Sequence, residues 1–194
     1  MIRALIFDCF GVLYVDPSHD FYEKQVPNYT ELRPQLMDLN KQSDYGLITQ
    51  DEWKQAVAEV TGLAIEDVKQ NIQGVHLRNQ ALLDYSQELR ASYKVGMLSN
   101  IGTGAMDGFF SKDERDRLFD AVVLSAEVGL VKPHPEIFKL MADRLGLNPG
   151  ECVMIDDIED NCAGADAAGM LTVHYRTNQQ ARADLEVLLE ANRA

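Results

Sequence analysis

The sequence predicts an α/β protein in which helices cover both faces of a doubly wound parallel sheet. Three features support this fold class. A short apolar run, residues 4–7, ends on an aspartate, as a buried parallel strand does at its carboxyl end. A mostly helical block follows, from about residue 14 to residue 83. From residue 94 onward, strand and helix patterns alternate, which is typical of a parallel sheet with helical crossovers.

The first strand is expected over residues 3–8, and the helical block after it contains four segments. Residues 30–41 carry leucines at helical spacing. Residues 49–52 form a capping box that opens a second helix, and Gly62 ends it. Residues 65–72 predict a third, short helix, and residues 79–91 predict a helix that returns to the sheet.

Four further strands are expected, each followed by a helical pattern: residues 94–99, 121–125, 152–156 and 171–175. Pro135 begins one of these helices and Gly146 ends it. The helical block is too long to be a simple crossover between two strands. We therefore expect an α/β core domain, residues 1–15 and 86–194, and an inserted helical cap domain, residues 16–85.

The acidic composition restricts the partners of the protein. The chain of 194 residues has a formal net charge of -13, with 18 Lys and Arg against 31 Asp and Glu. This argues against nucleic acid or a membrane surface as partner, because a phosphate backbone requires a basic face. A small phosphorylated metabolite is compatible, since a bound cation neutralises one phosphate. With no signal peptide or membrane span, we expect a cytoplasmic monomer or homodimer.

The three cysteines, Cys9, Cys152 and Cys162, are odd in number and lack CxxC spacing. Neither a disulfide framework nor a zinc site is expected from this pattern. Free, buried thiols in a reducing compartment fit it. Cys9 is not expected to be a nucleophile, because the neighbouring Asp8 would raise the pKa of its thiol.

Polar clusters follow four of the predicted strands: Asp8, Ser99 with Asn100, Lys132, and Asp156 with Asp157. Because parallel strands end at one edge of the sheet, these clusters should meet there. The set suits phosphoryl transfer, with a carboxylate that attacks phosphorus to form an aspartyl-phosphate. Asp8 is the expected nucleophile. The hydroxyl and amide groups of Ser99 and Asn100 would bind the phosphate, and the ammonium of Lys132 would balance its charge.

A carboxylate can attack a phosphate only where the repulsion between the two is offset. Mg²⁺ supplies this through carboxylate ligands, waters and a substrate oxygen. We expect Asp8 and Asp157 as direct ligands, with Asp156 bound directly or through water. The sequence therefore predicts a magnesium site within the catalytic cluster.

The four clusters resemble, in order, the motifs of the haloacid dehalogenase (HAD) superfamily. They read Asp8-Cys-Phe-Gly-Val-Leu13, Leu98-Ser-Asn100, Lys132-Pro-His-Pro-Glu-Ile-Phe138 and Ile155-Asp-Asp-Ile-Glu-Asp-Asn161. The resemblance implies a Rossmann-like core with a helical cap of the C1 type between the first two motifs. It also implies a Mg²⁺-dependent phosphatase, with the backbone carbonyl of Phe10 as a further metal ligand.

Phe10 departs from the family pattern. Phosphatases of this family usually carry a second aspartate there, which protonates the leaving oxygen and then activates water. Such acid–base help is worth roughly 10²–10⁴-fold in rate. Three interpretations stay open: a phosphatase for a substrate that leaves easily, such as a sugar 1-phosphate; a 2-haloacid dehalogenase, which also has an aromatic residue there; or a weakly active or non-catalytic member. The acid pair Asp156–Asp157 favours the phosphatase.

A group elsewhere in the predicted cap could replace the missing acid. Asp16 and His19 lie near the first linker and are candidates for this role. Tyr45 and Gly46 precede the capping box, on a loop that could face the substrate.

Overall fold

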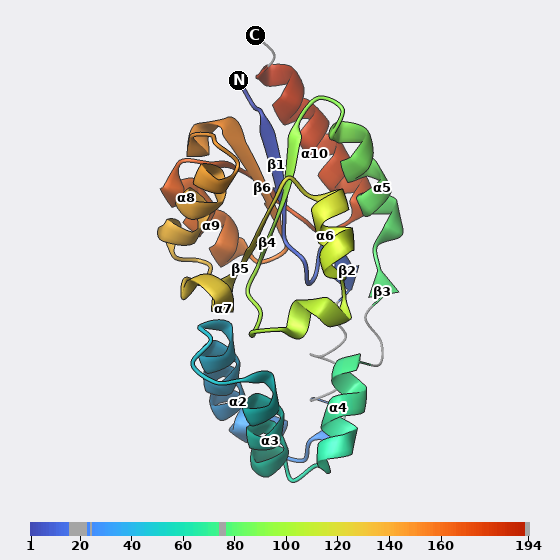
Figure 1. Ribbon diagram of the computed structural model, residues 1–194, viewed down its shortest axis with the longest axis vertical. Coiled ribbons are helices and arrows are strands. Elements are labelled where there is room, and N and C mark those ends of the chain that lie inside the picture. Colours follow the sequence, from blue (N-terminus) through green and yellow to red (C-terminus); the bar gives the residue numbers. More distant parts are fainter. Residues whose placement is uncertain (16–22, 24, 74–76, 193–194) are drawn as a thin grey trace.

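The computed structural model describes residues 1–15, 23, 25–73 and 77–192 (Figure 1). Its centre is a five-stranded sheet with the order β5-β4-β1-β6-β7, and all neighbouring strands are parallel. The strands are β1 (Ala4–Phe7), β4 (Lys94–Ser99), β5 (Ala121–Leu124), β6 (Cys152–Asp156) and β7 (Leu171–His174). The predicted parallel α/β fold is confirmed.

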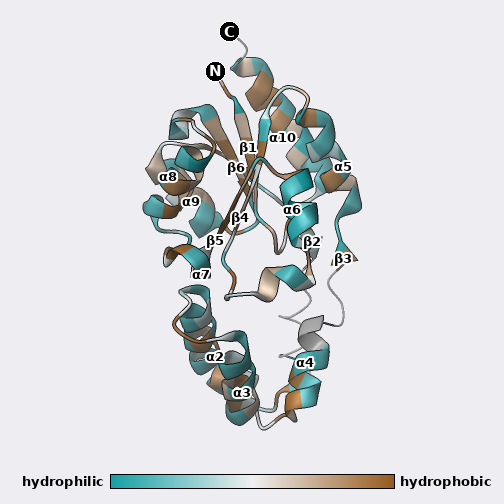
Figure 2. Cartoon of the chain, in the orientation of Figure 1, coloured by the Kyte–Doolittle hydropathy of each residue, from teal (hydrophilic) through white to brown (hydrophobic). Residues whose placement is uncertain are grey.

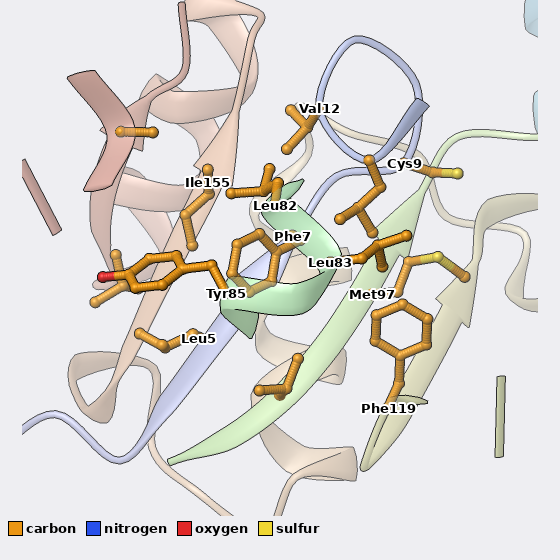
Figure 3. Packing of buried hydrophobic residues seen from close by; sticks show 14 of the residues in the cluster. Leu5, Phe7, Cys9, Val12, Leu82, Leu83, Tyr85, Met97, Phe119 and Ile155 are labelled. Atoms are coloured by element: carbon orange, nitrogen blue, oxygen red, sulfur yellow. The ribbon is translucent and has the colours of Figure 1, made fainter. Parts of the chain in front are cut away.

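Strand β1 lies at the middle of the sheet and is buried on both faces. Its side chains alternate between two hydrophobic clusters, as expected for successive residues of a strand. Leu5 and Phe7 belong to one cluster, with α5 (Gln80–Leu89) and α10 (Asn178–Ala191); Figure 3 shows Phe7 among side chains of α5. Ala4 and Ile6 belong to the other cluster, with α8 (Pro135–Arg144) and α9 (Glu159–Ala168). Helices thus cover both faces of the sheet.

Three inserted helices lie beyond the carboxyl ends of the strands (Figure 1): α2 (Tyr29–Asp44), α3 (Gln50–Thr61) and α4 (Ile65–Gln73). They share a small core of their own, formed by Leu36, Val57, Ala58 and Val68. The Thr49 capping box opens α3, and Gly62 ends it with a φ of 72°. Figure 2 shows both hydrophilic and hydrophobic residues along these helices.

A two-stranded antiparallel ribbon, which the sequence analysis did not predict, joins the two ends of this insertion. It pairs β2 (Tyr14–Val15) with β3 (Leu77–Arg78). Helix α5 follows β3, and its Leu82, Leu83 and Tyr85 pack in the cluster of the sheet. The expected domain boundary at residues 85 and 86 falls inside this helix. We therefore propose that α5 belongs to the core and that the insertion lies between β2 and β3.

The remaining elements connect the strands and include two short helices on either side of β5. Helix α6 (Lys112–Leu118) precedes β5, and α7 (Ser125–Val128) follows it directly. No helix in the described part of the chain is long and apolar enough to cross a membrane. The cytoplasmic location expected from the sequence stays a prediction.

Candidate active site

The three central strands end at the same edge of the sheet, which gathers the residues that follow them. Phe7 of β1 lies opposite Met97 of β4 and Ile155 of β6. The backbone N–H of Asp8 donates to the carbonyl of Ile155 at 2.9 Å, so the β1–β6 ladder continues up to the candidate nucleophile. Because the strands are parallel, the residues that follow them meet at this carboxyl edge.

Lys132 lies at the centre of this edge, on the loop between α7 and α8. Its Nζ atom is 2.8 Å from Oδ1 of Asp8 and 2.6 Å from Oδ2 of Asp156. All three residues are buried. Buried charges are tolerated where they are paired, so this triad fixes the side chain of Lys132 between two carboxylates.

The side chain of Asn100 holds the Lys132 loop. Its Oδ1 accepts a hydrogen bond from the backbone N–H of Lys132 at 2.9 Å, and its Nδ2 donates to the carbonyl of Lys132 at 3.0 Å. The sequence analysis assigned the amide of Asn100 to the phosphate. The side-chain amide thus holds the Lys132 loop, and the binding of phosphate by an N–H of Asn100 stays a prediction.

Asp156 is also held by several partners. Besides Lys132, its carboxylate accepts hydrogen bonds from the backbone N–H of Ile158 at 3.0 Å and from Nδ2 of Asn161 at 2.9 Å. Both of its oxygens are therefore used within the protein. This favours Asp156 as the residue that orients Lys132, with Asp8 and Asp157 better placed to take a direct ligand.

Three carboxylates of the site lie close enough together for one metal ion. Among the residues that the structure describes, Asp8, Asp156 and Asp157 each offer an oxygen within 4.8 Å of the others. Gly11 makes room for this group: it has a φ of 87°, and a Cβ there would lie 2.3 Å from Cγ of Asp157. An oxygen-only donor set of this kind suits a hard cation such as Mg²⁺.

Ser99, the last residue of β4, is fully buried. Its Oγ atom has no hydrogen-bond partner in the described part of the chain. A buried hydroxyl without a partner costs free energy, and such groups are rare. The binding of a phosphate oxygen by this hydroxyl, expected from the sequence, stays a prediction.

Burial dominates the electrostatics of the site. It raises the pKa of Asp8 to about 7, against the opposing effect of the Lys132 ammonium, and Asp156 and Asp157 raise it further. Burial also disfavours the charge on Lys132, but the carboxylates of Asp8 and Asp156 outweigh it and raise the pKa of the ammonium above its usual range. A further positive charge beside Asp8 would favour its ionised, nucleophilic form.

All three cysteines are free and buried, as expected. Burial, reinforced by the charge of Asp8, raises the pKa of the Cys9 thiol well above its ordinary value. Since the thiolate is the reactive form, Cys9 is unsuited to nucleophilic attack.

Phe10 lies two residues past Asp8 and carries no proton to donate. Its ring is partly buried and meets the ring of Phe109 edge to face, with centroids 4.8 Å apart. Its carbonyl as a metal ligand stays a prediction. Asp16 and His19, the suggested substitutes for the missing acid, lie outside the described residues.

The family model for haloacid dehalogenase-like hydrolases matches residues 2–169. This match covers most of the chain and all four motifs found in the sequence. The protein belongs to the haloacid dehalogenase-like hydrolases.

Among curated proteins, the chain is similar to the D-ribitol-5-phosphate phosphatase of Bacteroides thetaiotaomicron. The two are 29% identical over 215 aligned positions, which cover 98% of this chain and 100% of the relative. A partial match, 46% identical over 59 residues, links 30% of this chain to 25% of the glyceraldehyde 3-phosphate phosphatase of Methanopyrus kandleri. The phosphatase from Bacteroides is thus similar over its whole length.

Solved structures show the same fold. A HAD family enzyme from Bacteroides thetaiotaomicron, in complex with magnesium and inorganic phosphate, superposes with a TM-score of 0.75 at 27% identity, over 92% of this chain and 96% of that one. A HAD-like family hydrolase from Porphyromonas gingivalis gives a TM-score of 0.76 at 25% identity, over 97% of this chain and 98% of that one. The L-2-haloacid dehalogenase of Xanthobacter autotrophicus shares the fold, with a TM-score of 0.66 at 19% identity, over 100% of this chain and 85% of that one.

Proposed function

We propose that this protein is a phosphatase that hydrolyses a small phosphorylated metabolite through an aspartyl-phosphate on Asp8. The observation that carries the proposal is the buried cluster at the sheet edge. It combines a carboxylate, an ammonium held 2.8 Å away and the unpartnered hydroxyl of Ser99. The names of the relatives, which include two phosphatases of small phosphorylated compounds, support the same reaction class.

In this proposal each residue of the cluster has a distinct role. The carboxylate of Asp8 attacks phosphorus, and the bond to the leaving oxygen breaks. The hydroxyl of Ser99 and the backbone N–H of Asn100 bind non-bridging phosphate oxygens, and Lys132 balances the charge that they carry. Asp156 and the side chain of Asn100 keep Lys132 in place.

The carboxylates fit a magnesium ion, and we propose that Asp8 and Asp157 hold it, with the carbonyl of Phe10 and with Asp156 in support. Bound there, Mg²⁺ would offset the negative charge of the phosphate and favour the ionised form of Asp8. The donor set supports this proposal. Three carboxylates each offer an oxygen within 4.8 Å of the others, and Lys132 supplies one positive charge to two of them.

A 2-haloacid dehalogenase is the second candidate, because Phe10 matches its aromatic residue. The carboxylate cluster counts against it. A haloacid substrate is itself a carboxylate, and Asp156 and Asp157 would repel it in a buried site. The likeness to the dehalogenase of Xanthobacter concerns the fold alone.

A substrate panel tests the proposed function. Purified protein should release inorganic phosphate from p-nitrophenyl phosphate and from at least one of D-ribitol 5-phosphate, glyceraldehyde 3-phosphate or a sugar 1-phosphate. EDTA should abolish the release, and added Mg²⁺ should restore it. Chloride release from 2-chloropropionate, measured in parallel, should be absent. Chloride release that EDTA does not affect, without phosphate release, would overturn the proposal in favour of the dehalogenase.

Replacing Gly11 with alanine should weaken Mg²⁺ binding. The new Cβ would overlap the carboxylate of Asp157 and displace it, and outer contacts of this kind are worth about 10–100-fold in metal affinity. The positive φ adds a backbone cost of roughly 1–2 kcal/mol. Gly104→Ala is the matched control, because Gly104 has a φ of 76° but no atom within 4 Å of the added Cβ.

Titration of activity against Mg²⁺ concentration measures the effect, and thermal unfolding measures the strain. Both variants should lose stability, but only Gly11→Ala should need more Mg²⁺ for half-maximal activity. Equal Mg²⁺ requirements in the two variants would contradict the assignment of Asp157 to the metal.

A further inference from the structure

The carboxyl-terminal end of α2 rests on the core beside the site. Helices α2 and α7 are in contact, and Figure 1 shows α7 next to the upper end of α2. A Cβ on Gly46 would lie 2.7 Å from the carbonyl oxygen of Ala126, and a Cβ on Gly102 would lie 2.3 Å from Oγ of Ser43. Ser43 and Gly46 therefore touch the core directly, and Asp44, the last residue of α2, lies between them in the chain.

These core contacts belong to the loops that carry the site. Gly102 is two residues past Asn100, and the backbone N–H of Ile101 donates to Oγ of Ser125 at 2.9 Å. On the side of the inserted helices, Nε2 of Gln50 donates to Oγ of Ser43 at 3.3 Å. The end of α2 is thus fixed relative to the phosphate-binding residues at the end of β4.

Asp44 carries a partly buried carboxyl group, which makes no hydrogen bond or ion pair with a described residue. Burial raises its pKa to about 6, against the opposing effect of the Lys132 ammonium. The elements around it also carry Lys41, Tyr45, Asp51 of α3 and Glu127 of α7. The charge of Lys132 acts on Asp44, so this carboxyl lies within electrostatic reach of the catalytic cluster.

We propose that Asp44 is the proton donor to the leaving oxygen, in place of the acid that Phe10 lacks. The inference rests on the proposed phosphatase function. As Asp8 forms its bond to phosphorus and the bond to the leaving oxygen breaks, the Asp44 carboxyl gives its proton to that oxygen, and a neutral alcohol leaves. When water then attacks the aspartyl-phosphate, the Asp44 carboxylate takes up a proton from it, phosphate is released and Asp8 regains its carboxylate.

The requirement for a proton depends on the leaving group, which separates this role from a structural one. Nitrophenolate, with a pKa of about 7, leaves without protonation, whereas an alkoxide must be protonated as it leaves. The variant Asp44→Asn keeps the size of the side chain and removes the proton donor. The value of kcat/KM reports phosphoryl transfer to Asp8 and is independent of the later hydrolysis step.

The experiment compares kcat/KM of wild type and Asp44→Asn on D-ribitol 5-phosphate and on p-nitrophenyl phosphate, with Mg²⁺ present. We expect a loss of about 10²–10⁴-fold on the ribitol ester and less than about threefold on the nitrophenyl ester. If wild type hydrolyses only another alkyl ester of the panel, that ester replaces the ribitol ester. Asp38→Asn is the matched control, because Asp38 is exposed on the same helix, where Nε2 of Gln42 donates to it at 2.7 Å. The kcat/KM values of this variant on both esters should equal those of the wild type.

A second readout is the pH profile. In the wild type, kcat/KM for the alkyl ester should fall as pH rises above about 6, since only the protonated carboxyl donates. This decline should be missing in Asp44→Asn. Equal losses on both esters, or no loss on either, would overturn the role of Asp44. If wild type released phosphate from neither ester nor from any panel compound, the proposed phosphatase function itself would fall.

Discussion

Replacing Asp8 with asparagine should abolish phosphate release and leave the fold unchanged. The amide nitrogen and oxygen cannot form an acyl phosphate, so kcat should fall by at least about 10⁴-fold, as it does when a covalent nucleophile is removed. The substitution is nearly isosteric. Because burial already raises the pKa of Asp8 to about 7, loss of its charge should cost little stability.

Phosphate release and thermal unfolding, measured on the same preparations, check this result. The control is Asp160→Asn, which removes a carboxylate from the exposed start of α9, close in sequence to Asp156 and Asp157. The control variant should keep its activity. An Asp8→Asn protein with normal turnover would contradict covalent catalysis at this residue, whatever the substrate.

Local sequence signals were sufficient for most of the fold. The Thr49 capping box and Gly62 define both ends of α3 because each bonds to residues within one turn. The strands that carry the site are continuous apolar runs, which identify them as buried in a parallel sheet. Parallel topology then brings the residues that follow β1, β4 and β6 to one edge, without knowledge of any particular contact.

The missed features depend on contacts between distant parts of the chain. The side chain of Asn100 bonds to the backbone of Lys132, 32 residues later, so no local pattern distinguishes it from a phosphate ligand. The pairing of β2 with β3 involves only two residues from each strand. Asp44 has the sequence context of an ordinary last residue of a helix, and its proposed role arises only because α2 contacts α7 of the core.

Replacing Lys132 with methionine should remove activity and destabilise the protein at neutral pH. The ammonium pairs with two buried carboxylates, and its loss leaves Asp8 and Asp156 facing each other without a counter-charge. Breaking a buried ion pair by removing one partner typically costs about 3–5 kcal/mol. Urea unfolding in EDTA measures this cost without a contribution from bound metal. Lys112→Met is the control, because the ion pair of Lys112 with Asp116 is exposed and should matter little.

The loss of stability in Lys132→Met should depend on pH in a defined direction. Without Lys132 the pKa of Asp8 in the folded protein rises further, while in the unfolded chain it stays near about 3.9. Between these values the folded state binds more protons than the unfolded state, so the free energy of unfolding decreases as pH rises. The variant should therefore regain part of its stability when pH is lowered from about 8 to about 5.

The wild type should show a weaker change of the same sign, because Asp8 titrates near pH 7 while Lys132 stays charged throughout this range. A difference between variant and wild type that is the same at both pH values would mean that lost packing, and not unpaired charge, causes the destabilisation. A difference that shrinks at low pH would identify Lys132 as the counter-charge that allows Asp8 and Asp156 to share one buried site.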